Sequence, residues 1–185
     1  SKMDIKAFIF DMDGLLFDSE RIVQRSWEMA GDELEIPHMG DVIYHTLGMN
    51  RTGRNEYFRK YIREDFPFEE FGRLTRDNFW RIVDKEGLPL KKGVKELLAY
   101  GKEQGYKMAV ATSSSREYAM GNLIRAGIDP YFDSVICGDM VKKAKPDPEI
   151  YQKASESLRI PPEYCMAFED APGGILSAHQ AGMKV

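Results

Sequence analysis

The amino-acid sequence predicts an α/β fold in which a parallel sheet is covered by helices on both faces and a helical lobe is inserted after the first strand. Two observations predict it. Short apolar runs alternate with amphipathic helical patterns along most of the chain, which is typical of parallel strands joined by helical crossovers. Roughly seventy residues also follow the first run before this alternation resumes, whereas a strand and its helix are usually joined by roughly 2–6 residues. We therefore expect a core from residues 1–15 and 87–185 and a cap lobe from residues 16–86.

Short apolar runs are the predicted strands of the sheet. Their composition is that of parallel strands buried on both faces, where apolar residues follow one another without alternation. The runs are Ala7–Phe10, Met108–Ala111, Ser134–Cys137 and Tyr164–Phe168. The last residues, Met183–Val185, resemble the opening of a fifth strand, so we expect either a C-terminally truncated chain or an unusually short edge strand.

Helical periodicity fills the segments between these runs and most of the insertion. In the core, the patterns that begin at Lys92 and Glu117 stop at Gly105 and Gly127, and glycine suits the left-handed conformation that often ends a helix. The predicted core helices are Lys92–Gln104, Glu117–Ala126, Asp147–Leu158 and Ala171–Ala181. The predicted lobe helices are Glu20–Leu34, Arg54–Glu64 and Glu69–Lys85, whose aromatic residues we interpret as the core of the lobe.

The composition excludes two broad classes of protein. The 185 residues include 26 Lys and Arg against 30 Asp and Glu, for a net charge of −4. This balance argues against a general nucleic-acid binder, because affinity for the phosphate backbone requires concentrated positive charge. No apolar run approaches the ~20 residues that cross a bilayer, so we expect no membrane association. The first apolar run, Ala7–Phe10, is short and is followed by two aspartates, so it is not a secretory signal, and we expect a cytoplasmic protein.

Polar residues follow each predicted strand. Because the carboxyl ends of parallel strands meet at one edge of a sheet, these side chains are expected to gather there. Carboxylates crowded together repel one another unless a cation or a shared proton intervenes, and hard oxygen ligands of this kind suit Mg²⁺. An ammonium group and a serine-rich loop near a helix start would then hold phosphate oxygens. The residues are Asp11, Asp13, Thr112–Ser115, Lys145, Glu169 and Asp170.

These residues also resemble the motifs of a known family. Phe10–Gly14, Thr112–Ser113, Lys145–Pro146 and Phe168–Asp170 are similar, in order and in spacing, to the four motifs of the haloacid dehalogenase superfamily of phosphotransferases. The resemblance covers essentially the whole chain. It points to the branch of β-phosphoglucomutases and phosphoglycolate phosphatases, whose Rossmann-like core carries a helical cap after the first strand.

The resemblance implies a role for each catalytic residue. Asp11 would be the nucleophile that forms an aspartyl-phosphate. Asp13 would protonate the departing alcohol and later accept a proton from water, and its presence argues against carbon–halogen cleavage. Thr112 and the backbone N–H of Ser113 would bind phosphoryl oxygens, while Lys145 would offset negative charge between nucleophile and phosphate.

The same resemblance implies a Mg²⁺ site and a small phosphomonoester as the only partner. Mg²⁺ would be held by the Asp11 carboxylate, the Asp13 backbone carbonyl and Asp170, with Glu169 in or beside its coordination shell. A monomer is the expected state, because a cap can shield the site without a second subunit.

The resemblance leaves open which reaction and which substrate the chain serves. We expect a Mg²⁺-dependent phosphatase, with a sugar phosphate as the first choice of substrate. A β-phosphoglucomutase-type hexose-phosphate mutase is the alternative enzyme, although Val23 stands where the mutases carry a histidine. The segment Leu47–Arg51 resembles their cap substrate loop, so Asn50 and Arg51 are candidate substrate-binding residues. A candidate from a different functional class is a non-catalytic phosphate-sensing module, which would have the same fold but no enzymatic activity.

Overall fold

The computed structural model describes residues 4–46, 49 and 51–185, and the chain forms two compact units. The core unit comprises Ser1–Asp18 and Leu88–Val185, and the helical unit comprises Ser19–Gly87. The sequence analysis places its boundaries at residues 15/16 and 86/87. That the units are separate domains stays a prediction. Among the described residues, no helix is both long and apolar enough to cross a membrane.

The core unit is built on a four-stranded sheet with the order β3-β2-β1-β4. All neighbouring strands run parallel, and Phe10 lies opposite both Val110 of β2 and Phe168 of β4. This confirms the predicted α/β fold, and no strand end differs from the prediction by more than one residue. The strands are β1 (Ala7–Phe10), β2 (Lys107–Ala111), β3 (Ser134–Ile136) and β4 (Cys165–Phe168).

The predicted fifth strand is a single parallel bridge within the described chain. Lys184 pairs with Met166 of β4, and its carbonyl accepts a hydrogen bond of 2.8 Å from the N–H of Ala167. The pairing extends no further along β4, so the segment adds a bridge and not a full strand.

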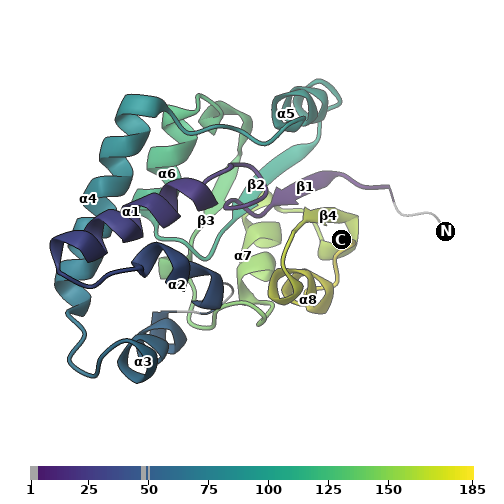
Figure 1. Cartoon of the computed structure of the whole chain (residues 1–185). Helices are drawn as coiled ribbons and strands as arrows, with labels where there is room; N and C mark the ends of the chain where they lie inside the picture. The colour runs from purple at the N-terminus through teal and green to yellow at the C-terminus, as the bar shows by residue number, and fades with distance from the viewer. Residues whose placement is uncertain (1–3, 47–48, 50) are drawn as a thin grey trace. The chain divides into compact units, whose positions relative to one another are not determined.

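Helices cover both faces of the sheet, and the alternation of side chains along β1 decides which residue faces which helices. Ala7 and Ile9 belong to an apolar cluster with α7 and α8, whereas Phe8 and Phe10 belong to a cluster with α5 and α6. Figure 1 shows α5 on one side of the strands and α7 and α8 on the other. The helices are α5 (Val94–Glu103), α6 (Arg116–Arg125), α7 (Glu149–Leu158) and α8 (Pro172–Gln180). Short 3-10 turns lie at Asp129–Tyr131, Gly138–Met140 and Pro162–Tyr164.

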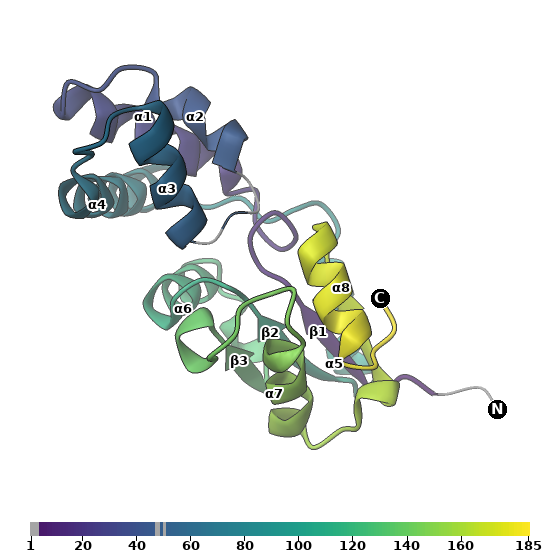
Figure 2. The same cartoon turned by 90° about the horizontal axis from the view of Figure 1, so that it is seen from below.

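The helical unit consists of α1 (Glu20–Glu33), α2 (Met39–Thr46), α3 (Arg51–Tyr61) and α4 (Phe68–Glu86) in the part of the chain that the structure describes (Figure 2). The sequence analysis predicts α1 and α4 within two residues at each end and does not predict α2. It also places the third helix at residues 54–64, whereas α3 begins and ends three residues earlier.

Aromatic side chains form the centre of the helical unit, as predicted. Phe58 is 1% exposed, and its ring contacts Trp27 at 5.6 Å, Phe66 at 4.7 Å and Phe71 at 5.7 Å between ring centroids. Burial of several such rings is the main source of stability for a small helical unit. Tyr61, one of the aromatic residues of the predicted helix Arg54–Glu64, is 61% exposed and does not belong to this core.

Candidate active site

Three carboxylates meet at the carboxyl ends of the two central strands. Asp11 follows β1, Glu169 and Asp170 follow β4, and one oxygen of each lies within 4.8 Å of the others. The paired register of Phe10 with Phe168 causes this meeting, because the residues after a paired position emerge side by side. Gly14 packs against the same group: its φ is +79°, and a Cβ added there would lie 2.5 Å from Oδ2 of Asp170. A side chain at this position would therefore displace a site carboxylate.

The ammonium group of Lys145 joins the strand ends from a third direction. Its Nζ donates to Asp11 Oδ1 at 3.1 Å, to Glu169 Oε2 at 2.6 Å and to the carbonyl of Ala111 at 3.0 Å. An ammonium group has three donors, so these contacts use all of them. The side chains of Lys145, Asp11 and Glu169 are 10%, 15% and 1% exposed, which makes this a buried ion-pair network.

Glu169 has a second partner that the sequence analysis does not identify. The hydroxyl of Tyr151, a fully buried residue of α7, donates a short hydrogen bond to Glu169 Oε2, the oxygen that also accepts from Lys145. The Lys145 Nζ lies 5.2 Å from the centre of the Tyr151 ring, within the range of a cation–π contact. A Cβ added at Gly174 of α8 would overlap the Glu169 carboxylate, so α8 closes the other side of that carboxylate.

The electrostatic environment makes Asp11 hard to ionise without a cation. Burial raises the pKa of Asp11 to about 7 from an ordinary value of 3.8. The charge of Lys145 lowers this pKa, while the charge of Glu169 and a hydrogen bond with Asp170 raise it further. A group whose ionised form is disfavoured by burial and by like charges is stabilised as an anion when a cation binds beside it.

Asp13 has partners of its own at the same edge of the sheet. Its Oδ2 accepts from the hydroxyl of Ser114 at 2.9 Å, and its Oδ1 accepts from the hydroxyl of Tyr118 at 3.0 Å. The neighbouring Thr112 is 2% exposed, and its hydroxyl oxygen accepts from the N–H of Ser114 at 3.1 Å. Ser113, the next residue along the loop, is exposed.

The donor set fits a hard divalent cation. Carboxylate oxygens are the ligands that Mg²⁺ prefers, and Asp11, Glu169 and Asp170 supply them from one compact group. Glu169 differs from the other two because its Oε2 is already occupied by Lys145 and Tyr151. The residues therefore fit Mg²⁺ best with Asp11 and Asp170 as its side-chain ligands and Glu169 beside them.

The other two predicted substrate residues come from the inserted segment. Arg51 is the exposed first residue of α3 and belongs to the helical unit, whereas the carboxylates belong to the core unit. Asn50 lies outside the described residues. The structure thus brings Asp11, Lys145, Glu169 and Asp170 together and holds Asp13 near Thr112 through Ser114.

Sequence signals for the additional residues are weak. Ser114 stands in the predicted hydroxyl cluster at Thr112–Ser115, so its neighbourhood is predicted although its partner is not. Tyr118 and Tyr151 lie on helices, where an aromatic residue is more often part of the core. Only the packing of α6 and α7 against the sheet reveals their hydroxyl contacts.

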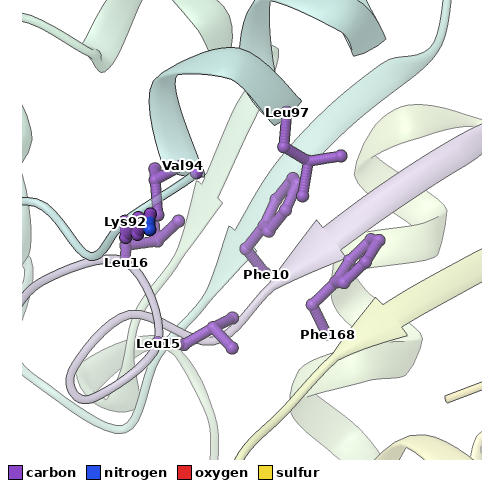
Figure 3. Close-up of a pocket in the computed structure, with 8 residues that line it drawn as sticks. Phe10, Leu15, Leu16, Lys92, Val94, Leu97 and Phe168 are labelled. Atoms are coloured by element: carbon purple, nitrogen blue, oxygen red, sulfur yellow. The ribbon is translucent and has the colours of Figure 1, made fainter.

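A small apolar cavity lies behind the strand ends and is not part of this site. Its volume is about 220 Å³, and its lining comprises Phe10, Leu15, Leu16, Lys92, Gly93, Val94, Leu97 and Phe168. Figure 3 shows the rings of Phe10 and Phe168 projecting side by side from neighbouring strands, and they stack with centroids 4.8 Å apart. None of the three clustered carboxylates lines this cavity, so it is separate from the group at the strand ends.

Comparison with known proteins places this geometry in a family. Residues 5–182 match the family model described as haloacid dehalogenase-like hydrolase. YhcW of Bacillus subtilis, a protein named as a phosphatase, is 34% identical over 184 residues, which cover 97% of this chain and 81% of that protein. The phosphorylated carbohydrates phosphatase of Thermotoga maritima is 31% identical over 180 residues, covering 97% and 83%.

A solved structure agrees with these relatives. CbbY from Rhodobacter sphaeroides, a variant in complex with xylulose-1,5-bisphosphate, superimposes with a TM-score of 0.82 and 26% identity. The alignment covers 97% of this chain and 84% of that one. The similarity therefore extends over both units of the present chain.

Proposed function

The chain belongs to the haloacid dehalogenase-like hydrolase family as a phosphoric monoester hydrolase, and we propose that it is a Mg²⁺-dependent phosphatase for a small phosphorylated sugar. One observation carries the proposal: Lys145 donates to Asp11 and Glu169 within a group of carboxylates formed by the ends of β1 and β4. A carboxylate with an ammonium group at 3.1 Å is suited to attack phosphorus, because the ammonium offsets the charge that accumulates there.

Asp11 acts as the nucleophile in this mechanism. A carboxylate oxygen of Asp11 forms a bond to phosphorus while the bond from phosphorus to the sugar oxygen breaks, leaving an acyl phosphate on Asp11. The carboxylic acid of Asp13 gives its proton to the departing oxygen, so that a neutral alcohol leaves. In the second half, the Asp13 carboxylate takes a proton from a water molecule while the water oxygen forms a bond to phosphorus. The bond between phosphorus and the Asp11 carboxylate oxygen then breaks, which releases inorganic phosphate.

Lys145, Thr112 and Ser113 hold the transferred group during both halves. When phosphate enters, Lys145 exchanges one of its present acceptors for a phosphoryl oxygen and keeps its charge beside Asp11. Thr112 directly follows β2, and in this mechanism its hydroxyl and the N–H of Ser113 donate to other phosphoryl oxygens. The chemistry that bound Mg²⁺ supplies is neutralisation of the negative charge shared by carboxylates and phosphate, with Asp11, Asp170 and the Asp13 carbonyl as its proposed ligands.

The sugar phosphate assignment rests on the relatives and on the helical unit. The Thermotoga relative is named for phosphorylated carbohydrates, and the CbbY structure holds a sugar bisphosphate. In the helical unit, Arg51 and Arg54 lie one turn apart at the start of α3, and burial together with the charge of Arg51 lowers the pKa of Arg54. Two adjacent guanidinium groups favour a substrate with a second anionic group.

This pair of arginines also keeps a hexose-phosphate mutase as the second candidate. A mutase must hold a bisphosphate intermediate in two orientations, and a second anion site serves that purpose. Val23, at the position where the mutases carry histidine, instead packs against the apolar cluster of the helical unit. An aliphatic side chain there offers no proton transfer, so the phosphatase is the better supported function.

A panel of phosphomonoesters tests the proposal. We expect the purified chain to release inorganic phosphate from sugar phosphates in the presence of Mg²⁺ and not in the presence of a chelator. Asp11→Asn should abolish turnover while the fold is retained. Asp129→Asn, a change of the same kind in the 3-10 turn before β3, should leave turnover intact.

Two other outcomes separate the alternatives. The mutase would be indicated if the chain converted glucose 1-phosphate to glucose 6-phosphate in the presence of a trace of bisphosphate and released no inorganic phosphate. No turnover with any member of the panel, combined with phosphate binding by calorimetry, would indicate the non-catalytic phosphate-sensing module.

A further inference from the structure

The carboxyl group of Asp13 is held at both of its oxygens by hydroxyl groups. Ser114 Oγ lies 2.9 Å from Oδ2, and the Tyr118 hydroxyl lies 3.0 Å from Oδ1. These donors stand 101 and 105 residues away in the sequence, so the contacts exist only because the fold brings the loop after β2 to the turn after β1. With a partner on each oxygen, the plane of the carboxyl group is fixed and not merely its position.

The backbones that carry the two hydroxyl groups are themselves hydrogen-bonded. The N–H of Ser114 donates to Thr112 Oγ1 at 3.1 Å, and the carbonyl of Ser114 accepts from the N–H of Gly138 at 2.8 Å. Tyr118 lies in the first turn of α6, where its N–H donates to the N-cap hydroxyl of Ser115 at 3.3 Å. The pair is therefore part of a bonded frame that extends from β2 into α6.

Hydroxyl partners suit a carboxyl group that must gain and lose a proton. A serine or tyrosine hydroxyl donates to a carboxylate and also accepts from a carboxylic acid, whereas an ammonium group can only donate. Ser114 and Tyr118 can therefore orient the Asp13 carboxyl group both before and after it gives up its proton. The Lys145 ammonium, by contrast, contacts Asp11 and Glu169.

We propose that Ser114 and Tyr118 are positioning residues for Asp13, and that they set how well the enzyme expels alcohols of high pKa. The inference rests on the proposed phosphatase function. When the ester bond to the sugar oxygen breaks, Asp13 must direct its O–H at that oxygen, and a rotated carboxyl group cannot do so. A phenolate with a low pKa leaves without the proton and does not need this alignment.

The leaving-group dependence of catalysis tests the inference. We would compare Ser114→Ala, Tyr118→Phe and the double variant with the parent enzyme on alkyl phosphates and on p-nitrophenyl phosphate. In each single variant, kcat/KM for alkyl phosphates should fall by roughly 10- to 100-fold, which is at most the lower end of the roughly 10²- to 10⁴-fold that general acid catalysis contributes. For the aryl ester, kcat/KM should fall by less than about threefold. Because both hydroxyls act on one carboxyl group, their effects should not add in the double variant.

Matched controls separate alignment from general damage. Ser157→Ala and Tyr131→Phe remove the same hydroxyl groups elsewhere in the core unit and should change neither substrate class. Equal losses on alkyl and aryl esters, or no loss in either single variant, would overturn the inference while an active parent enzyme left the phosphatase function standing. A parent enzyme inactive on every phosphomonoester would overturn both.

Discussion

At the scale of single residues, the ionisation of Asp11 opposes folding. Burial raises the pKa of Asp11 to about 7, and Lys145 only partly opposes this effect. A carboxyl group with a raised pKa in the folded chain keeps its proton between about pH 4 and pH 7, where the unfolded chain has already lost it. The contribution of Asp11 to stability therefore declines as the pH rises through this window and stays low above it.

Asp11→Asn should remove this dependence, because an amide does not ionise. In metal-free buffer at pH 8 the variant should unfold at a higher urea concentration than the parent. Its free energy of unfolding should be larger by on the order of a few kcal/mol, since one pKa unit corresponds to about 1.4 kcal/mol. Near pH 4 the two proteins should be about equally stable. Urea titrations at several pH values measure this, with Asp129→Asn as the control that shows no such trend. A gain that is the same at every pH would contradict the assignment.

At the scale of elements, the loop that carries Lys145 is anchored to the start of α7. The carboxylate of Glu149 accepts the N–H of Lys142 at 3.0 Å and that of Lys143 at 2.9 Å. These two backbone hydrogen bonds are the main cause of the lowered pKa of Glu149. A group with a lowered pKa stabilises the fold at neutral pH and loses that contribution as the pH falls through its folded-state pKa.

Glu149→Ala should therefore loosen the loop and weaken the placement of the Lys145 ammonium. We expect kcat to fall by roughly tenfold, given that a 1 Å misplacement of a catalytic group can cost about 10²-fold. The melting temperature at neutral pH should fall only slightly, because the two lost hydrogen bonds are exposed to solvent. Glu156→Ala on the exposed face of α7 is the matched control. Steady-state kinetics of both variants decide the matter: an equal kcat in the two would show that Glu149 does not position Lys145.

The elements of the fold differ in how far the sequence predicts them. The strands and the polar residues after them depend on local runs and on the geometry of parallel pairing, so Asp11, Lys145, Glu169 and Asp170 could be placed together from the sequence. The sequence does not predict α2, because its eight residues include Gly40 and only a short apolar pattern. The hydroxyl partners Tyr118 and Tyr151 could not be predicted, since their contacts depend on how α6 and α7 pack.

At the scale of the whole molecule, the core unit closes the ends of the inserted segment by itself. Phe17 forms an antiparallel bridge with Leu90, and the N–H of Asp18 donates to the carbonyl of Pro89 at 2.9 Å. The chain thus leaves and re-enters the core unit at adjacent points. Closing a long insertion costs little more than closing a short one, so roughly seventy residues can be accommodated here without disturbing β1.

A cation at the strand ends should consequently stabilise the core unit as a whole. Asp11 directly follows β1, and Glu169 and Asp170 directly follow β4. An ion bound between these carboxylates therefore links the carboxyl ends of two paired strands. Mg²⁺ at about 100 times its Kd should stabilise the folded chain by ~2.7 kcal/mol, and chelation should reverse the gain. The melting temperature measured by calorimetry across a Mg²⁺ titration reports this.

Asp170→Asn discriminates a specific site from general screening of charge. Asp170 is the exposed member of the three carboxylates, so its loss should remove most of the Mg²⁺-dependent rise in melting temperature with little effect on the metal-free protein. Asp139→Asn alters a carboxylate that accepts the N–H of Arg116 and takes no part in the group, so its Mg²⁺ response should match the parent. If Asp170→Asn responded to Mg²⁺ as strongly as Asp139→Asn, the stabilising ion would bind elsewhere. The ligand assignment, although not the phosphatase activity, would then be wrong.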